Sequence, residues 1–512
     1  QKIFEEQFLI YRGLTRPSKG LWLTYAANDA EGRELSPSSL IERLQRLDED
    51  LQIEPMPAFD LEETAPAAVF HLLGGEMRKA TAETPLSPLW QDIYGFFDEN
   101  SQWQKRLSLL KQGIGKTAKP ERLSPKTAKA LYGKNIFSSV SRLERFAGCP
   151  FSFFAEYGLK AEERRLYQLN TPDLGSLFHE VLELFSNKLE QDNLPWTSLT
   201  KEETTARIHA AVEDAAPRLG NRILLDSAAN QYLIRRLKRI STRAAWTLVQ
   251  HLQQGDFVPA GYEVGFGAHE ALPPIVIRLQ DGGSLILNGK IDRVDLLDAN
   301  GTRYVKIIDY KSGNKTFHFQ DIYYGLQLQL LVYLDAYLKY YKKTGASFKP
   351  GGVFYFRITD PTLALDEELS AEAIEKILYE KMRMSGLLLQ EDVLIHGLDH
   401  SLAESRSSAI VPVGYTKKGD PTAASNLATE EQYAAILDFV ATRTQEIGDA
   451  MKAGIITPAP YRDGQRTPCA YCSYRSLCRH SYAEAPKWRK LKKIDKADFW
   501  ETITPKQPPE TE

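Results

Sequence analysis

The chain has 512 residues but only four cysteines, five methionines and almost no excess charge of either sign. Four cysteines are far too few for a disulfide scaffold in a chain of this length, and they suit a reducing cytoplasm. The 64 lysines and arginines stand against 67 aspartates and glutamates, a formal net charge of −3, which excludes a histone-like polycation. No apolar run approaches the roughly 20 residues that span a bilayer, so we expect no contact with a membrane.

A Walker A phosphate loop, G-x-x-x-x-G-K-[ST], is missing as well, so these residues alone are not expected to hydrolyse ATP. Hydrophobic residues make up 43% of the chain and charged residues 26%, which is typical of globular proteins. Length alone favours two to four domains, at about 150 residues each. The chain begins with Gln1 and its first strand-like segment follows at once, so we expect a piece of a longer protein.

The order of local patterns predicts an α/β protein. Residues 8–26 suggest two strands, FLIY and LWLTYA, around a turn at 17–20, and residues 28–135 suggest a helical linker rich in proline. Ser141 and Glu144 predict a capping box that opens a helix running to Cys149. Helical periodicity follows at 171–190, 203–253, 322–342 and 430–453, and strand patterns occupy 262–311 and 353–358.

The most informative segment is residues 285–313, LILNGKIDRVDLLDANGTRYVKIIDYKSG, which predicts a β-hairpin. With a four-residue turn at 299–302, Asp292 falls directly across from Asp309, and Lys311 shares a strand face with Asp309. Two neighbouring carboxylates are unfavourable unless a cation neutralises them, and oxygen ligands of this kind suit Mg²⁺ or Mn²⁺. The alternative is an exposed hairpin with ordinary surface charges.

Two further helical patterns fit the same site. Gly175, His179 and Glu183 recur at every fourth position, so they share one helix face, and His179 offers an imidazole ligand. Gln329 and Tyr333 are also four residues apart and follow the hairpin by about twenty residues. An ordinary amphipathic helix would account for either pattern taken alone.

Together, G-x-x-x-H-x-x-x-E, GKIDRVD, IIDYKSG and LQLLVY resemble the RecB-type branch of the PD-(D/E)XK nucleases. This resemblance implies a metal-dependent deoxyribonuclease whose Lys311 is catalytic and whose Gln329 and Tyr333 support the site and the DNA. It implies that Mg²⁺ or Mn²⁺ is held by three side chains and one backbone carbonyl, those of His179, Asp292, Asp309 and Tyr310.

The cysteines form a second set, Cys149 and, some three hundred residues later, Cys469-x₂-Cys472-x₅-Cys478. Four thiolates suffice for a [4Fe–4S] cluster, and a structural Cys₄ zinc site is the rival. The spacing resembles the iron–sulfur staple of AddB-type and Cas4-type members of the same nuclease branch. That resemblance implies a structural cluster that pins the end of the domain to its first helix.

Other stretches, among them FLIYRGLTRPSKGLWLTYA, KPGGVFYFRITDP, SAIVPVGYTKKGD and TPCAYCSYRSLC, resemble the AddB family of bacterial helicase–nuclease subunits. Arg16 matches a helicase-motif arginine. The family implies an exonuclease that digests the 5′-terminated strand at double-strand breaks, paired with an AddA subunit in the cytoplasm. The implied fold is a PD-(D/E)XK core, a central mixed sheet flanked by helices, behind the end of a superfamily 1 helicase-like domain. The implied segments are 1–30 for the helicase-like end, 31–135 for the linker, 136–480 for the nuclease and 481–512 for a basic tail.

Single-stranded DNA requires a groove that combines cations with aromatic rings. The candidates are Arg293 in the hairpin, a cluster on the helix at 203–253, and the stretch 487–493 around Trp488. The cluster consists of Arg235, Arg236, Lys238 and Arg239, with Arg243. Solvated helix faces, or packing of the C-terminal stretch on a partner subunit, are the alternatives.

Two rival functions remain at this point. The first is a stand-alone Cas4-like iron–sulfur exonuclease, against which the helicase-motif remnant and the chain length argue. The second is a DNA-binding scaffold without catalysis, against which the complete set of Asp292, Asp309, Lys311 and His179 argues.

Overall fold

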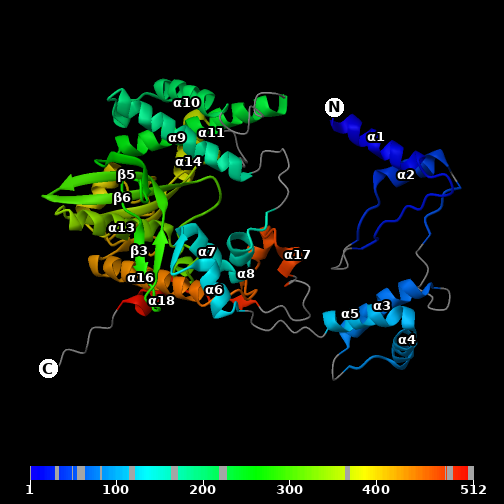
Figure 1. The fold of residues 1–512 in the computed structure, drawn as a ribbon. Helices are drawn as coiled ribbons and strands as arrows, with labels where there is room; N and C mark the ends of the chain where they lie inside the picture. The colour runs from blue at the N-terminus through cyan, green and yellow to red at the C-terminus, as the bar shows by residue number, and fades with distance from the viewer. Residues whose placement is uncertain are drawn as a thin grey trace. The chain divides into compact units, whose positions relative to one another are not determined.

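The computed structural model describes residues 2–28, 34–48, 50–54, 64–80, 84–114, 122–162, 171–217, 228–363, 369–478, 480 and 488–504. The chain divides into two compact units, Gln1–Thr117 and Ala118–Glu512 (Figure 1). None of the helices in the described residues is both long and apolar enough to cross a bilayer.

The first unit is helical. Its buried apolar residues, Val69, Leu73, Phe97 and Leu107, come from three helices and are packed among aromatic rings. The helices of this unit are α1 (Lys2–Thr15), α2 (Ser39–Leu47), α3 (Pro66–Lys79), α4 (Pro88–Glu99) and α5 (Ser101–Ile114).

The strand predicted at FLIY is wrong, because these residues belong to α1. Phe4, Phe8 and Tyr11 recur at helical spacing, with Glu5 in the first turn and Arg12 in the last, as the helix dipole favours. The predicted partner LWLTYA forms no strand in the described residues either. An isolated two-stranded hairpin is marginal in water, so local alternation alone does not make a strand here.

The second unit is built on a six-stranded mixed sheet in the order β2-β5-β6-β7-β8-β9. Parallel pairs join β6 to β7 and β8 to β9, and the other neighbours are antiparallel. The strands are β2 (Val258–Phe266), β5 (Gly289–Ala299), β6 (Thr302–Lys311), β7 (Phe348–Arg357), β8 (Ser385–Leu389) and β9 (Leu427–Ala428). Smaller sheets contain β1 (Asn135–Ser138), β3 (Ile275–Arg278) and β4 (Ser284–Leu287), and β10 (Tyr461–Arg462) with β11 (Arg489–Lys490).

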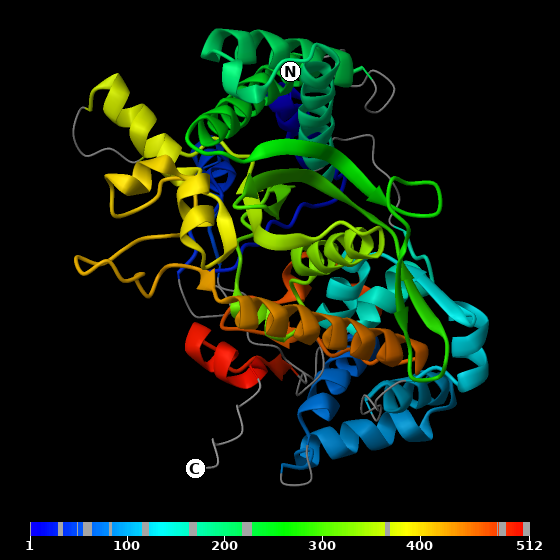
Figure 2. The same ribbon diagram turned by 90° about the vertical axis from the view of Figure 1, so that its left-hand side faces the viewer.

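Helices cover both faces of this sheet, with α9, α10 and α11 on one side and α13 and α16 on the other (Figures 1 and 2). The longer helices are α9 (Thr171–Gln191), α10 (Lys201–Ala215), α11 (Ala228–Gln253), α13 (Gln329–Lys343), α14 (Ala371–Lys381) and α16 (Glu430–Lys452). The shorter ones are α6 (Pro125–Tyr132), α7 (Val140–Gly148), α8 (Pro150–Phe153), α12 (Phe319–Tyr323), α15 (Asp392–Leu398), α17 (Arg475–Cys478) and α18 (Lys496–Ile503). Single helical turns occur at η1 (Phe154–Gly158), η2 (Trp196–Ser198), η4 (His400–Ala403) and η5 (Pro468–Tyr471). The fold is therefore the predicted central mixed sheet flanked by helices.

The predicted hairpin is confirmed as β5 and β6. Ala299 pairs with Thr302, and the two residues between them, Asn300 and Gly301, have φ of 52° and 75°. Two consecutive positive φ values match a tight hairpin turn that favours Asn-Gly.

Several predicted boundaries differ from the structure. The N-cap of α7 is Ser139 and not the predicted Ser141. The Ser139 side chain accepts a hydrogen bond from the backbone amide of Arg142. The predicted helix at 322–342 is divided into α12 and α13, because Gly325 between them takes φ +73°. By contrast, α16 begins with the predicted capping box of Thr429 and Gln432.

Residues 488–504 are not a separate tail. β11 pairs with β10, and α18 packs on α12 and α16 with Phe499 and Trp500 buried. Their rings lie 5.1 Å and 5.4 Å from that of Phe319 on α12. Aromatic burial therefore draws this segment onto the body in spite of its basic residues.

Candidate metal centre

The site begins where the β5–β6 ladder ends. The last ladder pair is Arg293 with Ile308, so the register places Asp292 across from Asp309, as the sequence predicted. One residue further on, the amide of Tyr310 donates 2.6 Å to Oδ2 of Asp292. If the ladder continued, the Tyr310 amide would donate to a backbone carbonyl of β5, but here it donates to the Asp292 side chain. Both Asp292 and Asp309 are buried at this point.

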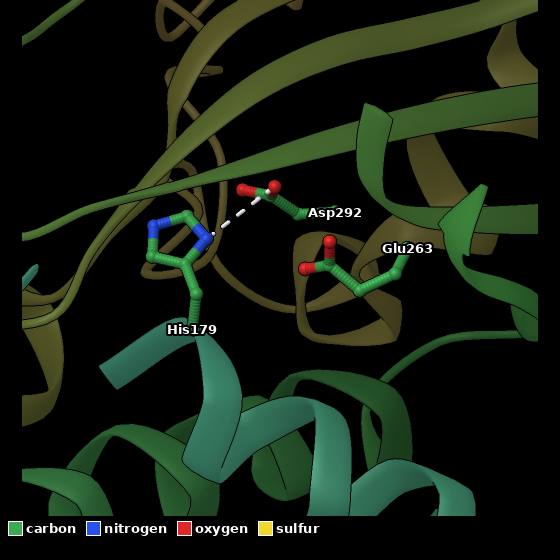
Figure 3. A group of neighbouring side chains, drawn as sticks. All are labelled: His179, Glu263 and Asp292. Carbon is green, nitrogen blue, oxygen red and sulfur yellow. Dashed lines mark ion pairs between the residues drawn. The ribbon is translucent and has the colours of Figure 1, made fainter. Parts of the chain in front are cut away.

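Helix α9 brings His179 to the same place. Its Nδ1 lies 3.4 Å from Oδ1 of Asp292. A carboxylate oxygen of Glu263 on β2 completes a group in which one ligand atom from each residue lies within 4.8 Å of the others (Figure 3). The three side chains point toward one another from a helix and two strands. Imidazole and carboxylate donors converging in this way suit Mn²⁺ or Mg²⁺.

Glu263 was not predicted from the sequence. It sits across from Asp292, between the pairs Tyr262–Arg293 and Val264–Ile291. Its φ of +46° is unusual for a residue other than glycine, and such backbone strain gathers at functional sites. The one signal in the sequence was a carboxylate within the apolar stretch GYEVGF. That signal identifies a site residue only when the register of β2 on β5 is known, and the sequence does not specify this register.

Lys311 and Gln329 complete the surroundings of Asp309. The Lys311 ammonium lies 2.5 Å from Oδ2 of Asp309, and the Gln329 amide donates 2.8 Å to Oδ1. Lys311 also donates 3.4 Å to Oε1 of Gln329. These contacts orient both carboxylate oxygens of Asp309 and bring Asp309, Lys311 and Gln329 together.

Helix α13, which carries Gln329 and Tyr333, is anchored from α7. Oε1 of Glu144 accepts the amides of Leu328 and Gln329 at 2.8 Å and 3.1 Å, and its Oε2 pairs with Lys315. The N-cap residue itself supplies no side-chain cap. A carboxylate from another helix therefore satisfies the first amides of α13 and fixes its start beside the site.

The glycines of two sequence motifs have steric roles. A Cβ on Gly289 would lie 2.1 Å from the Tyr333 hydroxyl, so only glycine lets that ring lie against β5. A Cβ on Gly175 would lie 2.9 Å from Oγ of Ser312, a contact that rotation of the serine side chain relieves. The stricter steric requirement is therefore at Gly289.

The electrostatics of the site favour a bound cation. Burial, followed by the charge of Asp292, raises the pKa of Asp309 to about 7 in spite of Lys311. Burial and the charges of Asp292 and Glu183 raise the pKa of Glu263 to about 7. Burial, the largest single effect, lowers the pKa of His179, but its hydrogen bond to Asp292 and the charges of Asp292 and Asp309 together outweigh burial, so the net shift is upward. A divalent cation bound here would offset the unfavourable ionisation of Asp309 and Glu263, the two carboxyl groups whose pKa is raised.

The centre opens into a cleft of about 650 Å³ lined by Gly175, His179, Glu183, Glu263 and Ser312 among others. Glu183 therefore lies at the cleft, as its helical spacing predicted. The cleft therefore reaches two members of the metal group, His179 and Glu263.

Arg293 lies elsewhere. It is 1% exposed, its guanidinium is paired with Asp295 at 2.6 Å, and it lies over the ring of Trp196. Lys306 reaches the other oxygen of Asp295 at 2.8 Å. A buried, paired guanidinium is not available to a phosphate, so the predicted DNA contact of Arg293 is wrong.

The other predicted DNA contacts are on α11, outside the cleft. Arg235, Lys238 and Arg239 line a different pocket, whereas Arg236 is exposed and does not line it. In the C-terminal stretch, Arg489 donates to the Ala147 carbonyl.

The four cysteines are brought together from distant segments. Cys149 lies at the junction of α7 and α8 and is buried, whereas Cys469 lies on η5, Cys472 directly follows η5 and Cys478 ends α17. Sγ of Cys472 lies 4.0 Å from Oγ of Ser152 on α8. Burial raises the pKa of the Cys469 thiol, and the charges of the other three cysteines raise it further. This donor set fits either a cluster or zinc.

Comparison with known proteins agrees with this geometry. Residues 64–113 match the family model of the "ATP-dependent helicase/deoxyribonuclease AddB fifth domain". The chain is 39% identical over 509 residues, 98% of its length, to an ATP-dependent helicase/deoxyribonuclease subunit of Alkaliphilus oremlandii. It is 40% identical over 483 residues to the protein of the same description from Alkaliphilus metalliredigens, and 93% of the chain is covered. The chain spans 44% and 42% of these relatives' own lengths.

A second family model covers the part of the chain that carries the centre. Residues 138–479, about two thirds of the chain, match the model of the PD-(D/E)XK nuclease superfamily. This range contains the strand pair, both flanking helices and all four cysteines. The chain belongs to the PD-(D/E)XK nuclease superfamily.

Proposed function

We propose that the unit around the metal centre hydrolyses phosphodiester bonds of DNA with a divalent metal ion, Mg²⁺ or Mn²⁺. The observation that carries the proposal is the convergence of His179, Glu263 and Asp292 beside the Asp309–Lys311 pair. These residues would hold the ion, with the Tyr310 carbonyl as the further ligand expected from the resemblance. When bound, such an ion lowers the pKa of a water molecule and polarises a phosphate oxygen.

The chain's own residues supply positioning and charge. Lys311 presents an ammonium at the mouth of the buried aspartates, where it can orient the attacking water and stabilise the negative charge that develops on the phosphate. Gln329 keeps Asp309 oriented toward the centre, and Tyr333 holds α13 against β5. Glu263 adds a third carboxylate that the family resemblance alone did not indicate.

The test is cleavage of end-labelled single-stranded DNA with Mg²⁺ by the purified chain and by its Lys311→Ala variant. We expect cleavage by the parent chain and none by the variant. Lys339→Ala, which removes an exposed lysine of α13 that is paired with Asp335, is the matched control and should cleave like the parent. Cleavage by Lys311→Ala at the parental rate would contradict the proposed role of Lys311.

We further propose that this unit works as the nuclease of a helicase–nuclease complex with an AddA-type partner, degrading the 5′-terminated strand in the cytoplasm. The proposal is supported by the relatives' names, which describe one subunit of an ATP-dependent helicase/deoxyribonuclease. Co-purification with the partner subunit and digestion of duplexes labelled at either end would test association and polarity. A chain that never associates with the partner would favour the Cas4-like alternative.

We also propose that Cys149, Cys469, Cys472 and Cys478 hold a structural [4Fe–4S] cluster. Its support is that Sγ of Cys472 lies 4.0 Å from Oγ of Ser152, three residues after Cys149, so that coordination would tie together segments about three hundred residues apart. Iron and sulfide analysis of anaerobically purified protein distinguishes the cluster from zinc. One zinc and no iron per chain would contradict the proposal.

A further inference from the structure

A second pocket lies away from the metal centre, between α10, α11 and α14, helices that Figure 1 labels at one end of the second unit. Its volume of about 590 Å³ falls within the range of ligand sites. Glu375 is the carboxylate among its lining residues, against six cationic side chains. These are Lys201, Arg235, Lys238, Arg239, Arg243 and Lys376.

Half of these cations are already neutralised. Arg239 and Arg243 share Asp360 at 2.9 Å and 3.2 Å, Arg243 also lies 3.6 Å from Glu375, and Lys238 is paired with Glu213 at 2.6 Å. Within the described part of the chain, no carboxylate lies at ion-pair distance from the other three. These are Lys201, Arg235 and Lys376, which are all exposed. The pocket therefore presents unneutralised positive charge from three different helices.

The pocket also offers an aromatic surface and a free hydroxyl. Trp246 and Tyr379 are half-buried in its wall, and Tyr379 is held by its edge-to-face contact with His251 at 5.3 Å. The buried hydroxyl of Thr242 has no hydrogen-bond partner among the described residues. Cations beside aromatic faces are the means by which proteins hold single-stranded nucleic acid without reading its sequence.

We propose that this basic pocket holds a segment of single-stranded DNA at a position separate from the catalytic cleft. Lys201, Arg235 and Lys376 bind backbone phosphates, and Trp246 stacks on a base. Helix α9 carries His179 at the cleft and packs on α10, which carries Lys201 at the pocket, so one helical layer serves both. The inference rests on the proposed function, because DNA is the ligand only if this chain acts on DNA.

The experiment measures binding without cleavage. The chain carrying Asp309→Asn is titrated with fluorescent oligo-dT in EDTA, and anisotropy gives the Kd at several salt concentrations. Removing two phosphate contacts with Arg235→Gln and Lys376→Gln should weaken binding about 25-fold near roughly 0.1 M salt and lower the salt slope by about 1.4, because each contact to a single strand contributes about 0.7.

Two controls accompany this measurement. The pair Lys126→Gln and Lys129→Gln removes the same charge from the exposed face of α6 and should leave the Kd within about twofold. Arg235→Lys keeps the charge and should retain most of the affinity, while thermal unfolding shows that each variant is folded. An unchanged Kd and salt slope in the Arg235→Gln, Lys376→Gln protein would overturn the proposal.

The outcome is separable from the test of catalysis. A parent chain that cleaves DNA while the pocket variant binds normally overturns the pocket alone. A chain that binds DNA through the pocket but cleaves nothing with any divalent ion supports the pocket and overturns the proposed nuclease function.

Discussion

Replacing Glu263 by glutamine should stabilise the metal-free protein and weaken metal binding at the same time. Its pKa rises from 4.5 to about 7 on folding, chiefly because of burial. At about 1.4 kcal/mol for each tenfold change in proton affinity, the ionised form is destabilised in the folded protein by up to about 3 kcal/mol. The Glu263 side chain is 17% exposed, and solvent screening reduces this destabilisation. We therefore expect Glu263→Gln to raise the free energy of unfolding by about 1–3 kcal/mol.

The pH dependence follows from the direction of that shift. Since the folded-state pKa lies above the unfolded value, the cost of the ionised carboxylate grows as pH rises and is complete above about 7. Urea unfolding in EDTA should therefore show Glu263→Gln more stable than the parent at pH 8 and similar to it at pH 5. The variant should also bind Mn²⁺ at least about tenfold more weakly.

The matched control for this prediction is Glu190→Gln, an exposed carboxylate at the far end of α9. It should change neither the stability at pH 8 nor the affinity for Mn²⁺. A Glu263→Gln protein that is less stable than the parent at pH 8 without metal would refute the reasoning, as would one that binds Mn²⁺ with parental affinity.

Three other perturbations test the framework of the site. Gly289→Ala should destabilise the protein by about 1–3 kcal/mol, because the new Cβ meets the Tyr333 hydroxyl. In a Tyr333→Leu background the same substitution should no longer lower the free energy of unfolding. A destabilisation that persists in that background would contradict the steric explanation. Cys149→Ala should lose its iron and unfold at lower temperature, as metal analysis and calorimetry would show; full iron retention would exclude Cys149 as a ligand. Glu144→Ala should cost about 1 kcal/mol by uncapping α13 and lower kcat more than it raises KM; equal kcat would show that the start of α13 does not position the site.

The parts of the site that the sequence predicted are those with short-range signals. Asp292, Asp309 and Lys311 lie in one hairpin, where the turn at Asn300 and Gly301 fixes the register and alternation fixes the face. His179 and Gln329 each lie on a helix whose period is explicit in the sequence. Their meeting at the hairpin came from the family resemblance, because local patterns do not specify how helices dock.

The failures have a common physical cause. Glu263 reaches the site through the pairing of β2 with β5, and Glu144 reaches α13 from more than 180 residues away. Arg293 lies in a sequence motif but points to the opposite side of β5, where Asp295 neutralises it. In each case a long-range contact decides the role of the residue, and composition and spacing carry no information about it.

The central claim is that His179, Glu263, Asp292 and Asp309 surround one divalent metal site. Anomalous X-ray diffraction from crystals of the full chain soaked in Mn²⁺ tests it most directly. We expect one strong anomalous peak within coordination distance of the His179 imidazole and the Asp292 carboxylate, and its loss in the Asp292→Asn protein. A Mn²⁺ peak elsewhere, with none between α9 and β5, would contradict the account.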